Sequence, residues 1–274
     1  MVYYYLKEKP GKDVTLEFLD AGGRLIRKLS SADKPAEEEG ERPGRMSGRG
    51  TPPLPAEAGL NRFVWNMRYP DAERVPGAIL WAGLTAGPVA VPGIYQAKLT
   101  VDGEAMTRTW EWKKDPRLET SQEEFEEQFD FLLQIRDKLS EVNQTVIRLR
   151  EVRQKIERLA REIKSLDKSA PVIEEGKKIL AGLTAIEEVL IQSRSKSNQD
   201  PLNYPIKLDN KIAALAGVVA GADARQTDQS RELFKELAAA ADAEIARFQS
   251  ILEKDVPGLN AMLKEAGIPH IFIQ

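Results

Sequence analysis

The sequence predicts two different domains in tandem, an antiparallel β-sandwich over residues 1–116 and an antiparallel bundle of about four helices over residues 117–274. Three observations predict this division. All four Trp and five of the six Tyr precede Pro116, and the remainder is rich in Glu, Lys, Arg, Leu, Ile and Ala. Apolar residues alternate with a period of two before this proline, and they follow a 3,4 spacing after it. These are the periods of strands and helices.

The first part contains short runs that are typical of strands. Asp102-Gly103 predicts a two-residue hairpin turn between two such runs. About six or seven strands in roughly 115 residues favour a sandwich of the immunoglobulin or fibronectin type III kind. The residues expected to share inward faces are Val14, Leu16 and Phe18; Phe63, Trp65 and Met67; Tyr95, Ala97, Leu99 and Val101; and Trp110 with Trp112.

Residues 31–58 interrupt this pattern. The stretch holds nine Gly or Pro residues and an acidic run at Glu37–Glu39, with almost no apolar periodicity. Such a composition predicts a mobile loop or an insertion.

A long helix is expected over 121–165. Ser121 and Glu124 have the spacing of a capping box, in which each side chain binds the other residue's backbone amide. Arg153 is the one polar residue on the apolar seam of this helix. A buried carboxylate partner is the favoured explanation, and a ligand site is the alternative. The seam consists of Leu132, Ile135, Leu139, Val142, Val146, Leu149, Ile156, Ala160 and Ile163.

Three further amphipathic helices follow. The second begins at 169–171 and buries Val172, Ile179, Leu183, Ile186 and Leu190; the third runs from Leu208 to about Gly221 and buries Ile212, Leu215 and Val219. Thr227 is expected to cap the fourth, which carries Phe234, Leu237, Ala241, Ile245, Phe248 and Ile251. Pro257-Gly258 is expected to end it, because proline lacks the amide hydrogen that a helix interior uses.

Composition excludes several kinds of chemistry. Forty Lys+Arg against 43 Asp+Glu is too acidic a balance for a typical nucleic-acid-binding protein. The chain has no Cys and a single His, His270, so thiolate chemistry, zinc fingers and His-based triads are disfavoured. The acidic start of the long helix complements the helix dipole rather than forming a metal cluster. We therefore assign no catalytic, cofactor-binding or metal-ligating residue.

Three aromatic residues form a candidate contact surface: Trp81, Tyr69 and Tyr204. Trp81 lies in a loop-like stretch, where covering the end of the sandwich is the favoured role. Docking against a neighbouring domain and stacking on a sugar are the alternatives.

Tyr204 belongs to the polar segment 202–211 between two apolar helices. We expect a structural corner there, in which Asn203, Asp209 and Asn210 cap backbone groups at the start of the third helix while Tyr204 and Ile206 pack inward. A ligand-contacting loop is the alternative.

Four motifs resemble a known family. They are Gly59–Pro70 (GLNRFVWNMRYP), Gly87–Tyr95 (GPVAVPGIY), Asp115–Arg117 (DPR) and Leu202–Lys211 (LNYPIKLDNK). Together they resemble the C-terminal region of large bacterial proteins with sortilin-like, BNR-repeat β-propellers, which are often labelled glycosyl hydrolase or sialidase-like. The resemblance covers nearly the whole chain and implies an immunoglobulin-like module followed by a helical region.

The resemblance also implies partners and a location. The partner is an upstream β-propeller of the same polypeptide, and the location is extracellular or periplasmic. The family's hydrolase label belongs to the propeller and its Asp box, Ser-x-Asp-x-Gly-x-x-Trp, which this sequence lacks. A strand that starts almost at Met1 agrees with a piece of a longer protein, and no apolar run is long enough to predict a membrane span.

The first functional hypothesis is a non-catalytic accessory module that braces or presents the propeller. The second is a carbohydrate- or peptide-binding module that uses the sandwich aromatics or a groove between sandwich and bundle. A hydrolase with its site in this chain is the least favoured, because the residues of a nucleophile and base pair are missing. We expect residues 118–274 alone to be helical and to fold cooperatively, since their apolar pattern is separate.

Overall fold

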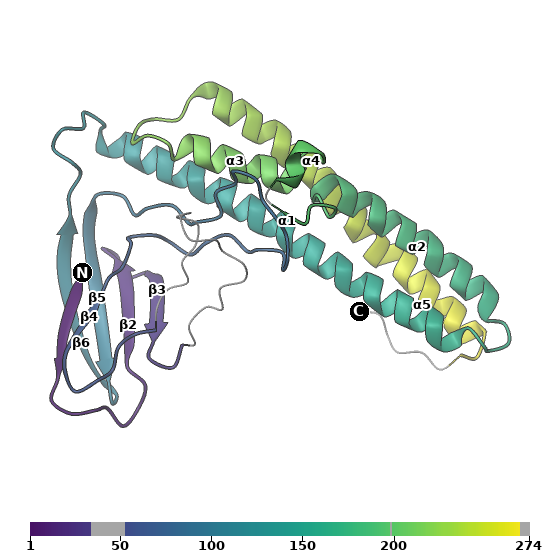
Figure 1. Ribbon diagram of the computed structural model, residues 1–274, viewed down its shortest axis with the longest axis horizontal. Coiled ribbons are helices and arrows are strands. Elements are labelled where there is room, and N and C mark those ends of the chain that lie inside the picture. Colours follow the sequence, from purple (N-terminus) through teal and green to yellow (C-terminus); the bar gives the residue numbers. More distant parts are fainter. Residues whose placement is uncertain (34–52, 198, 269–274) are drawn as a thin grey trace. The chain divides into compact units, whose positions relative to one another are not determined.

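The computed structural model describes residues 1–33, 53–197 and 199–268, and Figure 1 colours them along the sequence. The chain forms two compact units. The first, the sheet unit, consists of Met1–Ala72, Thr85–Gln134 and Val219–Gln226. The second, the helical unit, consists of Glu73–Leu84, Ile135–Val218 and Thr227–Gln274. This division differs from the predicted boundary at residue 116, because contacts between segments far apart in the sequence decide which parts pack together.

The strands of the sheet unit form two antiparallel sheets. The smaller pairs β1 (Val2–Leu6) with β4 (Gly59–Phe63), and the larger has the order β3-β2-β5-β6. The strands of the larger sheet are β2 (Thr15–Asp20), β3 (Leu25–Ser30), β5 (Gly93–Val101) and β6 (Glu104–Trp112). The predicted loop at 31–58 falls mainly on residues 34–52, which lie outside the described residues.

The predicted alternation is confirmed in the core of this unit. Val14, Leu16 and Phe18 are buried, as are Phe63, Trp65, Met67 and Tyr95. The inward faces of both sheets contribute to one cluster, against which Ala97, Leu99, Val101, Trp110 and Trp112 pack as partly buried residues. The core role predicted for the two tryptophans is therefore confirmed.

Aromatic rings form the centre of this cluster. Phe18 stacks on Trp65 with ring centroids 4.3 Å apart, and Trp110 meets Trp65 edge-on at 6.2 Å. The polar ends of the buried rings find backbone acceptors, since the Trp65 indole donates to the Arg68 carbonyl at 3.1 Å and the Tyr95 hydroxyl to the Val91 carbonyl at 2.6 Å. These contacts satisfy the polar groups that burial would otherwise leave unpaired.

The predicted hairpin is also confirmed. Val101 lies opposite Glu104, and Asp102-Gly103 joins β5 to β6. Both turn residues have a positive φ, 51° for Asp102 and 97° for Gly103. This is the backbone of the tight turn that the twist of paired strands favours.

The helices are α1 (Gln122–Ile163), α2 (Ser169–Leu190), α3 (Leu208–Val219), α4 (Asp228–Ser250) and α5 (Val256–Glu265). The caps predicted for α1 and α4 are present. The Ser121 amide donates to the Glu124 carboxylate at 2.8 Å, and the Glu124 amide donates to the Ser121 hydroxyl at 3.2 Å. Thr227 caps α4 by accepting from the Ser230 amide.

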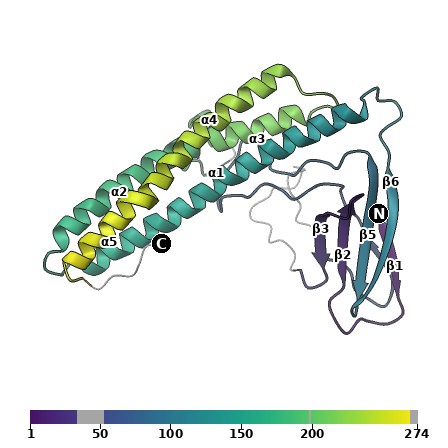
Figure 2. The same cartoon turned by 180° about the vertical axis from the view of Figure 1, so that it is seen from behind.

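Apolar seams hold the helices together in the helical unit, where α2 and α5 lie alongside the later part of α1 (Figures 1 and 2). The inward residues predicted for α2 are all buried. Small residues allow close approach, since a Cβ on Gly176 would lie 3.3 Å from Ile156 and one on Gly182 would lie 3.3 Å from Ile251.

Arg153 has the buried carboxylate partner that its place on the seam predicted. Glu187 of α2 is only 5% exposed. It accepts from the guanidinium of Arg153 and, at 2.8 Å, from that of Arg150. Two guanidinium groups thereby compensate the cost of burying one carboxylate.

The predicted helix end at Pro257 is wrong. A π-helical turn over Ile251–Asp255 follows α4 directly, and α5 begins at Val256. A π turn accommodates an extra residue within a continuing helix. Pro257 thereby falls in the first turn of α5, where a missing amide hydrogen is tolerated.

Among the described residues, no helix has the length and apolarity that crossing a bilayer requires.

Phe18 provides a test of the shared core. We expect Phe18→Ala to lower the unfolding free energy by about 3–5 kcal/mol, the usual cost of deleting a buried aromatic ring. Tyr5→Ala is the control, because Tyr5 is 69% exposed, and it should change stability by less than about 0.5 kcal/mol. Urea denaturation followed by tryptophan fluorescence measures both. Equal losses in the two variants would contradict the core assignment.

Candidate functional site

The three predicted contact residues belong to different segments of the chain. Tyr69 belongs to the sheet unit, and Trp81 and Tyr204 belong to different segments of the helical unit. The Tyr69 ring meets Phe129 edge-on at 4.8 Å, and burial raises the pKa of the Tyr69 hydroxyl. Tyr69 is thus part of the packing of its own unit.

Tyr204 lies in the corner between η1 (Asp200–Leu202) and α3. It is half-buried, and the guanidinium carbon of Arg194 lies 5.2 Å from its ring centroid, within cation–π range. Ile206 is also half-buried. The packing expected of Tyr204 and Ile206 is therefore seen in part.

Trp81 lies on a segment that we call the strap, Glu73–Leu84. The strap has no helix or strand, and it contains Pro76-Gly77, with a φ of 73° at Gly77 and 53° at Ala82. A segment of this kind needs hydrogen-bond partners from elsewhere for its buried backbone groups. Trp81 is 47% exposed, and its favoured role as a cover over the sandwich end stays a prediction.

Asn210 of α3 holds one end of the strap. The Trp81 amide donates to the Asn210 Oδ1 at 2.8 Å, and the Asn210 Nδ2 donates to the Trp81 carbonyl at 2.7 Å. The Leu84 amide donates to the carbonyl of Ala213 at 2.8 Å. Gly83 permits this approach, since a Cβ there would lie 2.8 Å from the Cβ of Ala213. The carboxamide expected to cap α3 therefore binds a distant backbone instead.

Residues of α1 hold the other end. The Glu73 amide donates to the Ser140 hydroxyl at 3.1 Å, and the Asn143 Nδ2 donates to the Glu73 carbonyl at 2.6 Å. Asn143 is 3% exposed and Val75 is 4% exposed. The strap is thus fixed at Glu73 and at Trp81 by buried carboxamides.

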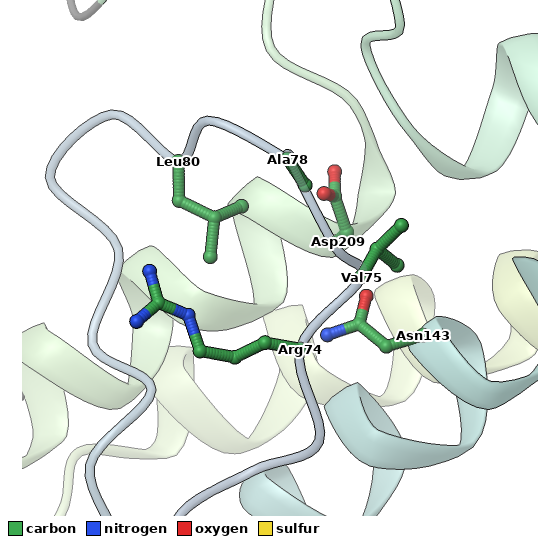
Figure 3. A pocket seen from close by; sticks show the side chains of 6 residues that line it. All are labelled: Arg74, Val75, Ala78, Leu80, Asn143 and Asp209. Atoms are coloured by element: carbon green, nitrogen blue, oxygen red, sulfur yellow. The ribbon is translucent and has the colours of Figure 1, made fainter. Parts of the chain in front are cut away.

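A small cavity lies between these two attachments (Figure 3). Its volume is about 10 Å³, roughly what one water molecule requires. Pockets for small organic ligands are typically about 300–1,000 Å³, so the cavity does not suit a substrate of that size. Its lining residues are Arg74, Val75, Ala78, Leu80, Asn143 and Asp209.

Asp209 is the chemically distinctive group of this cavity. It is 2% exposed, and its Oδ1 has no hydrogen-bond partner among the described residues. Burial raises the pKa of Asp209 to about 7, although the backbone amide of Asn210 favours the charged form. Arg74 is the other charged residue that lines the cavity, and its guanidinium extends toward Leu80 rather than toward this carboxylate (Figure 3).

The described residues contain no group of three or more His, Cys, Asp or Glu side chains that could hold a metal ion. The arrangement around the strap is suited to holding a backbone and one water molecule. Burial brings the pKa of the Asp209 carboxyl to about 7, so this group can bind a proton near neutral pH.

The sequence did not predict the strap, the binding of its backbone by Asn143 or the raised pKa of Asp209. A signal for Asn143 was present, because it falls between Leu139 and Val146 at the 4,3 spacing of the seam. The strap itself left no periodic signal.

Asp209 predicts a pH dependence of stability. Its pKa is raised by burial to about 7 in the folded chain, from an ordinary value of 3.8. Between these values the folded state holds a proton that the unfolded state has lost, so the unfolding free energy should fall as the pH rises. The slope from this group is at most about 1.4 kcal/mol per pH unit. The contribution should be fully present below about pH 4 and lost above about pH 7.

Urea denaturation at several pH values measures this slope. Asp209→Asn should flatten it, whereas Asp167→Asn should leave it unchanged, because Asp167 is exposed. Parallel profiles for Asp209→Asn and the wild type would contradict the assignment.

Asn210→Ala tests the attachment of the strap. It removes both partners of the Trp81 backbone, which should cost about 1–3 kcal/mol, and hydrogen exchange at the Trp81 amide should accelerate. The Leu84 amide, bound to a backbone carbonyl, should be affected less. Asn203→Ala is the control, since Asn203 is exposed. Unchanged protection at Trp81 would show that the carboxamide is dispensable.

No family model matches this chain, and neither a curated protein nor a solved structure matches it. The function is therefore argued from the geometry described above and from the four motifs of the sequence.

Proposed function

We propose that this chain is a non-catalytic accessory module that braces a neighbouring part of a larger protein. One observation carries the proposal, a largely apolar face that β1 and β4 turn toward solvent, on which Arg62 lies opposite Tyr3. Tyr3, Tyr5 and Leu60 are 56%, 69% and 73% exposed, and the register places Leu60 opposite Tyr5. Contiguous exposed apolar surface of this kind marks sites of protein interaction, and tyrosine is enriched at such sites.

The use of the buried polar groups supports a structural role. Asn143 and Asn210 bind the strap backbone, and Glu187 is neutralised by two arginines. Side chains committed in this way position segments of the chain rather than a substrate. The proposal therefore assigns no catalytic residue and no cofactor.

We infer the finer architecture from the same contacts. The shared core of the two sheets supports a β-sandwich of the immunoglobulin or fibronectin type III kind. The apolar seams of α1, α2, α3 and the continuous α4–α5 support an antiparallel bundle of about four helices.

We infer the identity of the braced part from the family that the four motifs resemble. In this proposal the partner is a sortilin-like β-propeller of the same polypeptide, and the location is extracellular or periplasmic. The glycosyl hydrolase label would then describe the propeller.

A second candidate function is the binding of carbohydrate or peptide. The observation that favours it is the half-exposed ring of Trp81 on the strap, because exposed aromatic rings offer large, rigid contact surfaces. A response of tryptophan fluorescence to oligosaccharides, lost in Trp81→Ala, would favour this function over bracing.

A protein that joins this chain to its propeller tests the first proposal. We expect the double variant Tyr5→Lys, Leu60→Lys to lower the Tm of the propeller, because charges on the contact face oppose docking. The exposed Gln144→Lys is the control. A propeller Tm indifferent to the double variant would contradict bracing through this face.

Enzyme assays test the non-catalytic assignment. The purified chain should show no turnover of aryl glycosides or sialosides above buffer, because two carboxyl groups in contrasting environments across a cleft are needed for that chemistry. Turnover that survives purification and disappears on mutation of one carboxylate would overturn the assignment.

A further inference from the structure

β6 is an outermost strand of the larger sheet in the part of the chain that the structure describes. Every residue of β6 except Trp110 and Trp112 is exposed. An edge strand presents unpaired backbone amides and carbonyls, which can pair with another chain. The nine residues of β6 make this edge longer than the average strand.

The register with β5 identifies the groups on the free edge. The two-residue turn closes the pair Val101 and Glu104, which is therefore a hydrogen-bonded pair, and such pairs alternate along antiparallel strands. The backbone groups that point away from β5 then belong to Ala105, Thr107, Thr109 and Glu111. The Arg108 guanidinium already donates to the Thr107 carbonyl at 3.3 Å, as expected for an acceptor that β5 does not use.

We propose that β6 pairs antiparallel with β6 of a second copy of this chain, with Thr109 on the two-fold axis. Thr107 of each copy then lies opposite Glu111 of the other, and their backbone groups exchange hydrogen bonds. The larger sheets of the two copies become one continuous sheet. The occupant is a second copy because this strand is complementary to itself in that register.

The side-chain pairs carry the argument for self-complementarity. Arg108 lies opposite Trp110 of the second copy, which suits a cation–π contact. Met106, 59% exposed in one copy, lies opposite Trp112 of the second copy, which suits a sulfur–aromatic contact. If the pairing continues two residues past the end of β6, Glu104 lies opposite Lys114 of the second copy, an opposite-charge pair, and the Lys114 ammonium also donates to the Thr120 carbonyl of its own copy at 2.8 Å. The two-fold axis makes each pair occur twice.

Neighbouring symmetric registers are less favourable. An axis at Arg108 or at Glu111 would place identical charges directly opposite each other, which is destabilising. An axis at Thr107 would leave Trp112 opposite the hairpin turn. An axis at Trp110 would replace the Glu104–Lys114 pair and place Met106 opposite Lys114. The axis at Thr109 alone among these combines opposite charges with covered apolar groups.

Sedimentation velocity of the full chain from about 1 to 100 µM tests the proposal, over the range of weak to moderate affinities. The wild type should pass from monomer to dimer as the concentration rises. Thr109→Lys places two like charges at the axis and should weaken dimerisation at least about tenfold. Gln154→Lys adds the same charge at an exposed position on α1 and should dimerise as the wild type does.

Cross-linking tests the register, because the chain has no cysteine of its own. In Thr109→Cys the two Cα atoms would lie about 5.5 Å apart, within reach of a disulfide. In Glu111→Cys they would be about 13 Å apart, four residues along the strand. Mild oxidation should therefore cross-link Thr109→Cys and leave Glu111→Cys uncross-linked.

Three outcomes would overturn the proposal. The wild type could stay monomeric throughout the concentration range, as it would if the edge took a different extended chain. Thr109→Lys could dimerise as strongly as the wild type, which would place the interface elsewhere. Both cysteine variants could cross-link equally, which would show random collision rather than this register.

Discussion

The carboxamide of Asn210 holds the Trp81 backbone through hydrogen bonds of 2.8 and 2.7 Å, and the placement of the strap depends on this contact. The strap has no regular structure that would pair its own amides and carbonyls. Each buried group must find a partner on a helix, because an unpaired buried amide costs about 1–3 kcal/mol. Asn143 plays the same part at Glu73. Two carboxamides thereby connect a loop from the first third of the chain to α1 and α3.

Two buried carboxylates described in the helical unit, Glu187 and Asp209, have different surroundings. Glu187 meets Arg150 and Arg153, so its charge is compensated where it lies. Asp209 faces a water-sized cavity with one oxygen unpartnered, and burial raises its pKa to about 7. An uncompensated buried carboxyl binds a proton more readily, because burial disfavours its charged form. The strap is thus attached beside a buried group, Asp209, whose pKa burial raises to about 7.

The sheet unit separates its aromatic residues into two roles. Phe18, Trp65 and Trp110 form the centre of the core, whereas Tyr3 and Tyr5 lie on the outward face of β1. Buried rings stabilise the unit itself, and exposed rings are available for contact with another surface. The β1–β4 face and the edge of β6 are different surfaces, so bracing a neighbour and pairing with a second copy make separate demands on the chain.

The sequence by itself determined most of the strands and helices and their inward faces, because these depend on local periodicity and capping, but it placed a helix end at Pro257 where the chain continues into α5. The capping box at Ser121, the hairpin at Asp102 and the carboxylate partner of Arg153 all followed from spacing or from a polar residue on an apolar seam. Tertiary structure alone decided that the strap packs with the helices and that Asn210 binds Trp81 rather than capping α3. These contacts join residues 129 positions apart. No local pattern specifies them. A buried backbone amide or carbonyl needs a hydrogen-bond partner, but that partner can come from any part of the chain that folding brings within reach.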